Sequence, residues 1–175
     1  GIFPWYIDEY NYIHWFSPQK RMIIKPEEMK VSKSLKKSVL NKGFVIKSNE
    51  NFEAVMRNCS NIKRKHEDST WISEEFIQAY TDLHHLDIAF SIECYLDEEL
   101  VGGLYGLLIG DVFCGESMFA KVTDASKVAF YHLCQQAEKN GIKLIDCQVY
   151  NDHLASLGAH EITREDYFKI LKESF

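Results

Sequence analysis

Glu116, Asp146 and Gln148 are the side chains of this sequence best placed to do chemistry. Each lies in a short apolar segment, where a charged or polar group is unfavourable unless it is paired or serves a site. Side chains two residues apart point to the same face of a strand, so Asp146 and Gln148 are predicted to share one face of the segment LIDCQ. By the same period, Glu116 is predicted to share a face with Met118. We therefore expect two carboxylates and an amide to converge beside apolar side chains, although Asp146 and Gln148 could instead satisfy buried backbone groups.

The hydrophobic pattern predicts the strands that carry these residues. Residues 89–96, 100–109 and 112–120 are apolar runs separated by short turns, which is typical of an antiparallel meander. Residues 142–149 are too apolar for an exposed edge and are predicted to form a central strand. The sheet that positions the three polar side chains should therefore be mixed and mostly antiparallel.

Helices are predicted around this sheet. Asn51, Ser73, Asp124 and Thr163 each precede a helical pattern and are expected to act as N-terminal caps. The order of elements is then helix, antiparallel meander, helix, strand and helix. This order indicates an α+β fold in which helices flank the sheet.

The first third of the chain differs in composition from the rest. Aromatic residues crowd near the N-terminus, and residues 20–47 include nine basic and two acidic residues, although the whole chain has a net charge of −6. This basic segment could form a phosphate-binding face, with a solvated lysine surface as the alternative. Because residues 61–69 are polar and charged, we expect a small N-terminal subdomain over 1–66 and a larger domain over 67–175.

Length and composition indicate a globular protein without a membrane span or a metal site. The 175 residues are 46% hydrophobic, and no apolar run approaches the roughly 20 residues that a spanning helix needs. The five cysteines are odd in number and lack CxxC spacing, so we expect reduced thiols in a cytoplasmic protein. The histidines lack zinc-ligand spacing, and Cys147 should face away from Asp146 and Gln148. Metal and thiol chemistry are therefore not expected.

Six short motifs in a fixed order carry a family resemblance. They are GIFPW (1–5), WFSP (15–18), TWI (70–72), VGGLYGLLIGDVFCGESMFAKVTDASK (101–127), LIDCQ (144–148) and SLGA (156–159). With these motifs the chain closely resembles the leucyl/phenylalanyl-tRNA-protein transferases from Gly1 to about Tyr167. The resemblance implies a catalytic domain of the Gcn5-related N-acetyltransferase fold, which agrees with the predicted order of elements.

The resemblance also implies a reaction. Leucine or phenylalanine, with methionine as a further candidate, would move from aminoacyl-tRNA to the N-terminal Arg or Lys of acceptor proteins and mark them for N-degron degradation. The aminoacyl ester is already activated, so no cofactor, metal or ATP is implied. The protein would have to position the reactants, handle a proton of the attacking amine and stabilise the oxyanion.

The resemblance assigns roles to five residues. The residues matching Asp146 and Gln148 are the family's proposed catalytic pair, in which the amide of Gln148 orients the amine while Asp146 polarises that amide. The residue matching Glu116 is proposed to contact the basic acceptor residue. Trp5 and Trp71 match tryptophans that sandwich the terminal adenine, although many tryptophans simply belong to a core.

Further contacts are expected with the donor side chain and with the tRNA. Leu104, Phe113 and Met118 could line an apolar slot for the donor, with ordinary core packing as an equally good explanation. Three residues match the family's basic segment, which meets the acceptor stem of the tRNA: Lys33, Lys36 and Lys37.

A coenzyme A dependent N-acetyltransferase of the same fold is the main competing hypothesis, because fold alone does not determine function. That chemistry needs a glycine-rich loop before a helix N-terminus, and the segment VTDAS has no glycine where this loop would lie. A non-catalytic module that binds RNA or a degron is the third hypothesis.

Overall fold

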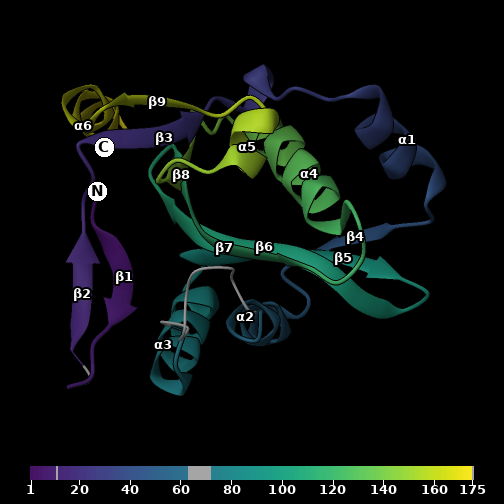
Figure 1. The fold of residues 1–175 in the computed structure, drawn as a ribbon, viewed down its shortest axis with the longest axis horizontal. Coiled ribbons are helices and arrows are strands. Elements are labelled where there is room, and N and C mark those ends of the chain that lie inside the picture. The colour runs from purple at the N-terminus through teal and green to yellow at the C-terminus, as the bar shows by residue number, and fades with distance from the viewer. Residues whose placement is uncertain (11, 63–71, 175) are drawn as a thin grey trace.

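The computed structural model describes residues 1–10, 12–62 and 72–174, and its centre is a seven-stranded sheet (Figure 1). From one edge to the other the strands are β4 (Val45–Ser48), β5 (Ala89–Leu96), β6 (Glu99–Ile109), β7 (Val112–Ala120), β8 (Leu144–Gln148), β3 (Lys20–Ile24) and β9 (His160–Thr163). In this sheet β7 pairs with β8 in parallel, and the other pairs are antiparallel. The predicted meander and the predicted central strand are both confirmed.

A separate hairpin precedes this sheet. It consists of β1 (Phe3–Ile7) and β2 (Ile13–Phe16), which pair in antiparallel fashion. In Figure 1 the hairpin extends from the body of the molecule on the same side as α3 (Glu74–His85). Most of the crowded aromatic residues of the N-terminus therefore lie in the strands of a two-stranded ribbon.

Helices cover both faces of the sheet (Figure 1). They are α1 (Lys33–Asn41), α2 (Phe52–Ser60), α3, α4 (Ala125–Lys139), α5 (Asp152–Ser156) and α6 (Arg164–Glu173), with the short 3-10 helix η1 at Pro26–Glu28. The largest apolar cluster lies between α4 and one face of the sheet. A second cluster joins α2 and α3 to the opposite face, and a third joins α6 to β3, β7 and β8. The core therefore consists of two layers divided by the sheet, as the α+β prediction requires.

The predicted helix caps are correct in position but not always in chemistry. The hydroxyls of Ser73 and Thr163 accept hydrogen bonds from the first turns of α3 and α6. Helix α2 follows Asn51 without a side-chain cap. Asp124 precedes α4 with a left-handed φ of 72° and makes no cap bond. Its carboxylate instead accepts a hydrogen bond from Ser38 of α1 at 2.8 Å, a tertiary contact that the local pattern could not indicate.

The predicted boundary near residue 66 falls outside the described residues. On either side of it the chain contributes to one sheet, because β3 and β4 pair with strands that follow the boundary. The division into 1–66 and 67–175 thus stays a prediction, and any such units would share a sheet.

The five cysteines all lie in the described residues, and no two of them are joined by a disulfide. Within the part of the chain that the structure describes, no helix combines the length and the apolar character that crossing a bilayer requires.

Candidate functional site

A cavity of about 640 Å³ lies where β7 and β8 separate. The parallel pairing of the two strands ends at Cys114 and Asp146, while β7 continues to Ala120. The cavity is lined by every residue of 115–120 and of 146–149. Because alternate side chains of a strand point to opposite faces, a cavity that touches every residue must lie along the strand edges. It therefore occupies a gap in the sheet.

Both faces of the sheet contribute walls to this cavity. The face under α4 supplies an apolar wall: Leu104, Phe113, Phe130, Leu133 and Ile145. The opposite face supplies Pro4, Trp5, Ile62, Tyr105 and Phe119. The cavity thus passes through the sheet, with an apolar slot on the α4 side and an aromatic mouth on the other.

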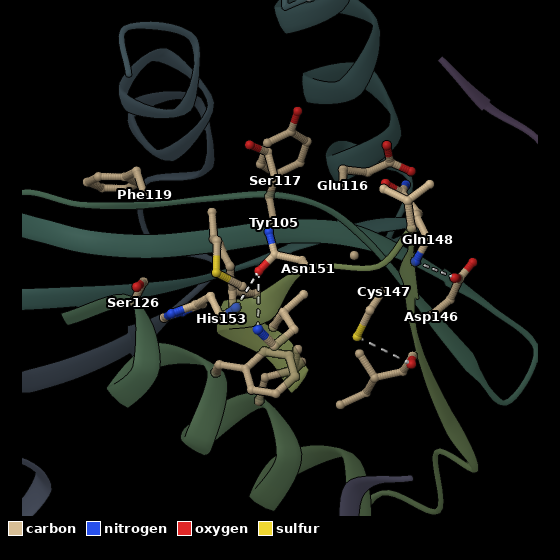
Figure 2. Close-up of a pocket in the computed structure, with 18 of the residues that line it drawn as sticks. Tyr105, Glu116, Ser117, Phe119, Ser126, Asp146, Cys147, Gln148, Asn151 and His153 are labelled. Carbon is tan, nitrogen blue, oxygen red and sulfur yellow. Dashed lines mark hydrogen bonds between the residues drawn. The ribbon is translucent and has the colours of Figure 1, made fainter. Parts of the chain in front are cut away.

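The three predicted chemical residues line the cavity together. Figure 2 shows Glu116 and Gln148 close to each other across the gap, with Asp146 beside them on β8. Cys147 points to the other side of β8, where it packs against the apolar cluster under α4. Burial and the charge of Asp146 raise the pKa of its thiol well above the usual value. The predicted convergence is confirmed, and so is the orientation of Cys147.

Asp146 is fully buried and its carboxylate is saturated with hydrogen bonds. Arg21 donates from Nε to Oδ1 at 2.7 Å and from Nη2 to Oδ2 at 2.5 Å. The hydroxyl of Tyr167 donates to Oδ2 at 2.7 Å, and the backbone N–H of Gln148 donates to Oδ1 at 2.8 Å. We expected Asp146 to polarise the side-chain amide of Gln148, but the hydrogen bond that Asp146 accepts from Gln148 comes from the backbone N–H. The carboxylate is consequently held in place by Arg21 and Tyr167 and shapes the end of β8.

Arg21 joins this carboxylate to the N-terminal hairpin. Its guanidinium lies between the rings of Phe3 and Tyr167, at 4.7 and 4.6 Å from their centroids, and donates to the carbonyl of Gly1 at 2.9 Å. Burial disfavours its charge, but the hydrogen bonds and attraction to Asp146 outweigh this and raise its pKa. Arg21 is 2% exposed, so it does not belong to the phosphate-binding face to which the basic segment had assigned it.

Gln148 ends β8 in a left-handed conformation, with a φ of 67°. The hydrogen bond from its N–H to the carboxylate of Asp146 stabilises this turn. Aspartate side chains often accept a hydrogen bond from the backbone N–H two residues further along the chain. The chain then leaves the sheet, which opens the gap beside β7. A strand period alone could not have predicted this turn.

Glu116 is the extra residue of a β-bulge. In the register of β6 and β7, Tyr105 faces Ser117 and Gly106 faces Gly115, so Glu116 has no opposite residue. A Cβ added at Gly106 would overlap the carbonyl oxygen of Cys114, so only glycine allows this close approach. A bulge re-aims a side chain by breaking the period of two.

The bulge contradicts the prediction that Glu116 shares a face with Met118. Met118 packs against the cluster under α4, whereas Glu116 interacts with Tyr80 of α3 on the opposite face. The extra residue shifts the period by one between these positions. Glu116 therefore shares the face of Asp146 and Gln148.

Burial gives Glu116 an unusual acidity. Burial and, second, the charge of Asp146 raise its pKa to about 7, while hydrogen bonds with Gln148 and Tyr80 act in the opposite direction. Its Oε2 oxygen is shielded from solvent. Both protonation states are populated near neutral pH, which suits a group that binds a cation or accepts a proton.

The remaining predicted residues are placed as follows. Trp5 lines the cavity mouth, is 43% exposed and lies 5.5 Å from the ring of Phe16. Leu104, Phe113 and Met118 all line the cavity. Trp71 lies outside the described residues. Three lysines are exposed on α1, away from the cavity lining: Lys33, Lys36 and Lys37.

Several cavity residues were missed by the sequence analysis. Phe130, Leu133 and Ile145 complete the apolar slot, but helix and strand periods mark them only as buried positions. Asn151 and His153 follow β8 and also line the cavity (Figure 2). Asn151 caps α5 by accepting bonds from the N–H groups of His153 and Leu154. Among the described residues, no group of three acidic, histidine or cysteine side chains is arranged to hold a metal ion.

Comparison with known proteins gives one consistent result. Residues 23–172 match the family model described as leucyl/phenylalanyl-tRNA protein transferase. The chain is 51% identical to a protein of that name from Flavobacterium johnsoniae, over 98% of this chain and 81% of that protein. It is 50% identical to one from Nitrosospira multiformis, over 99% of this chain and 74% of that protein.

Two solved structures share the fold. The crystal structure of FemX superposes with a TM-score of 0.63 and 11% identity, over 89% of this chain and 64% of that one. A functionally unknown conserved protein from Staphylococcus epidermidis superposes with a TM-score of 0.55 and 10% identity, over 82% of this chain and 57% of that one. At these identities the likeness concerns the fold alone.

Proposed function

Because the chain belongs to the leucyl/phenylalanyl-tRNA protein transferase family, we propose that it moves leucine or phenylalanine from aminoacyl-tRNA to the N-terminal Arg or Lys of acceptor proteins. The observation that carries this proposal is the cavity through the sheet. It combines an apolar slot, a buried carboxylate and an aromatic mouth in one continuous space. Such a reaction must bring together the apolar side chain of the donor amino acid, the basic first residue of the acceptor and the terminal adenine of the tRNA.

The donor side chain is assigned to the slot under α4. The walls there are branched and aromatic apolar residues, and Met118 adds a flexible thioether that accommodates different shapes. Leucine, phenylalanine and methionine are all apolar and unbranched at Cβ, so they suit such a slot. The terminal adenine is assigned to the mouth, where Trp5 is exposed, with Trp71 as its proposed partner.

The reaction forms an amide bond from the acceptor amine to the aminoacyl carbon and breaks the ester bond to the ribose oxygen. The proton lost by the amine ends on that oxygen. A free α-amine has a pKa of about 7.7–8.0, so part of it is already neutral near pH 7. The protein then contributes mainly by positioning, with the amide of Gln148 orienting the amine beside the ester.

Asp146 and Glu116 have separate parts in this proposal. Asp146, held by Arg21 and Tyr167, fixes the turn at Gln148 and so places its amide. Glu116 supplies negative charge for the guanidinium or ammonium of the acceptor residue. Binding that cation favours the ionised carboxylate, so the acceptor itself would lower the pKa of Glu116.

The tRNA is proposed to lie against α1. Lys33, Lys36 and Lys37 are exposed there, and Ser38 ties α1 to Asp124, the residue that precedes α4. Phosphate contacts of this kind supply affinity and register for the acceptor stem without reading sequence. Marking the acceptor for degradation is the proposed outcome.

A transfer assay with two donors tests the proposed function. A peptide starting with Arg is incubated with the protein and either leucyl-tRNA or acetyl-CoA, and its mass is followed. We expect the peptide to gain one leucine residue with the first donor and to stay unchanged with the second. Acetylation would identify an acetyltransferase, and tRNA binding without either product would identify a non-catalytic module.

A further inference from the structure

The free edge of β7 can be identified from one hydrogen bond. The N–H of Lys121 donates to the carbonyl of Val101 at 2.7 Å, so these opposite residues form a hydrogen-bonded pair of the antiparallel β6–β7 ladder. Hydrogen-bonded and non-hydrogen-bonded pairs alternate along such a ladder. The pairs that contain Met118 and Ala120 are therefore non-hydrogen-bonded. Their N–H and C=O groups point away from β6.

On that side lies the cavity and not another strand of the described chain. The pairing of β8 with β7 ends at Cys114 and Asp146, so β8 does not extend to Met118 or Ala120 of β7. Both Met118 and Ala120 line the cavity. Two sets of main-chain groups, about 7 Å apart along the strand, thus face the gap. This spacing matches alternate residues of an extended peptide.

We propose that this edge of β7 binds the first residues of the acceptor protein as an added parallel strand. The inference rests on the proposed function and adds to it the way in which the acceptor main chain is held. The acceptor would continue the position and direction that β8 leaves at Gln148. Main-chain pairing gives affinity that does not depend on side chains beyond the first residue, which suits an enzyme that must accept many proteins.

Charge and exposure select the acceptor as the occupant of this edge. Glu116 lies at the inner end of the free edge, where it complements a basic first residue. Ala120 lies at the outer end and is exposed, so a chain that runs along β7 reaches solvent there. An acceptor needs this exit because a whole protein follows its first residues. The donor amino acid is a single residue and fits the slot instead.

N-methylated acceptor peptides test the inference without altering the protein. A set of Arg-starting peptides carries one backbone N-methyl group at the second, third, fourth or a distal residue. Matched peptides carry a side-chain substitution at the same positions. In a parallel ladder only alternate residues bond to one neighbour, so KM should rise about five- to tenfold at alternate positions and kcat should change little. The side-chain substitutions should leave KM within about twofold.

The outcomes separate this inference from the proposed function. An alternating rise in KM supports an added strand. Equal KM values for all N-methyl peptides, or an equal rise at every position, would overturn it even if the unmodified peptide is transferred normally. Binding of the same peptides, measured by calorimetry, gives the same ranking without turnover. Failure to transfer leucine to the unmodified peptide would therefore count against the proposed function alone.

Discussion

At the scale of single residues, the site is organised by two carboxylates with different partners. Asp146 receives four hydrogen bonds, two of them from Arg21, whereas Glu116 is desolvated and has a pKa of about 7. The sequence alone identifies both residues, because carboxylates in apolar strands are conspicuous. It cannot assign their parts, since the partners of Asp146 lie up to 125 residues away.

Replacing Asp146 by Asn should affect both stability and rate. Arg21 would keep its charge in a buried site without a counter-ion, so the free energy of unfolding should fall by about 3–5 kcal/mol. The turn at Gln148 would be less well fixed, and the single-turnover transfer rate should fall about 100-fold. Urea unfolding and rapid-quench kinetics measure the two effects.

Tyr167→Phe is the graded control for that change. It removes one hydrogen bond to Asp146 but keeps the ring beside Arg21, so both effects should be smaller than with Asp146→Asn. If the Asn variant were as stable and as fast as the parent, the positioning role of Asp146 would be wrong.

The acidity of Glu116 predicts a pH dependence. Since its folded pKa of about 7 lies above the ordinary value of 4.5, the folded state binds a proton that the unfolded chain loses, and stability should fall as pH rises from 4.5 to 7. Acceptor binding should change in the opposite direction, because KM for an Arg peptide should decrease as the carboxylate ionises. Glu116→Gln should weaken binding and flatten both profiles. If KM depended on pH with the same slope in the Gln variant and in the parent, Glu116 would not be the group that recognises the acceptor.

At the scale of elements, the meander and β8 were predictable, but β1, β2, β3, β9 and the irregularities of the strands were not. The meander, the central strand and the starts of α3 and α6 follow from local patterns of apolar and capping residues. The bulge at Glu116, the left-handed turn at Gln148 and the tie from Asp124 to α1 depend on tertiary contacts. The bulge aims a carboxylate into the gap, the turn opens the gap, and the tie anchors the basic helix α1.

Helix α1 should contribute to tRNA affinity and not to chemistry. Changing Lys33, Lys36 and Lys37 together to Glu should weaken binding of whole aminoacyl-tRNA and lower the salt slope of that binding by up to about three. A minimal aminoacyl-adenosine donor has no acceptor stem, so its transfer should change little. Binding titrations at several salt concentrations and transfer with both donors provide the measurement. Equal losses with the two donors would mean that the substitutions damage the fold or the cavity.

At the scale of the whole molecule, two apolar layers are joined by a gap in the sheet between them. One layer supplies the slot under α4, and the other supplies the mouth near the N-terminal hairpin. Arg21 links that hairpin to Asp146, so the proposed adenine platform and the turn at Gln148 are fixed to each other. The order of the predicted elements and the order of the motifs were sufficient to predict the fold class and the family. The passage through the sheet required the three-dimensional register of β7 and β8.

Filling the slot tests this arrangement most directly. Leu133→Trp would place a large indole in the slot from α4, while Leu86→Trp adds the same group at an exposed position outside the cavity. The measurement is the single-turnover rate of leucine transfer from leucyl-tRNA to an Arg peptide, for variants whose melting temperatures show that they are folded. We expect Leu133→Trp to lower this rate at least about 100-fold without weakening the binding of uncharged tRNA, and Leu86→Trp to match the parent. Transfer at the parent rate by folded Leu133→Trp protein would contradict the assignment of the donor to this cavity.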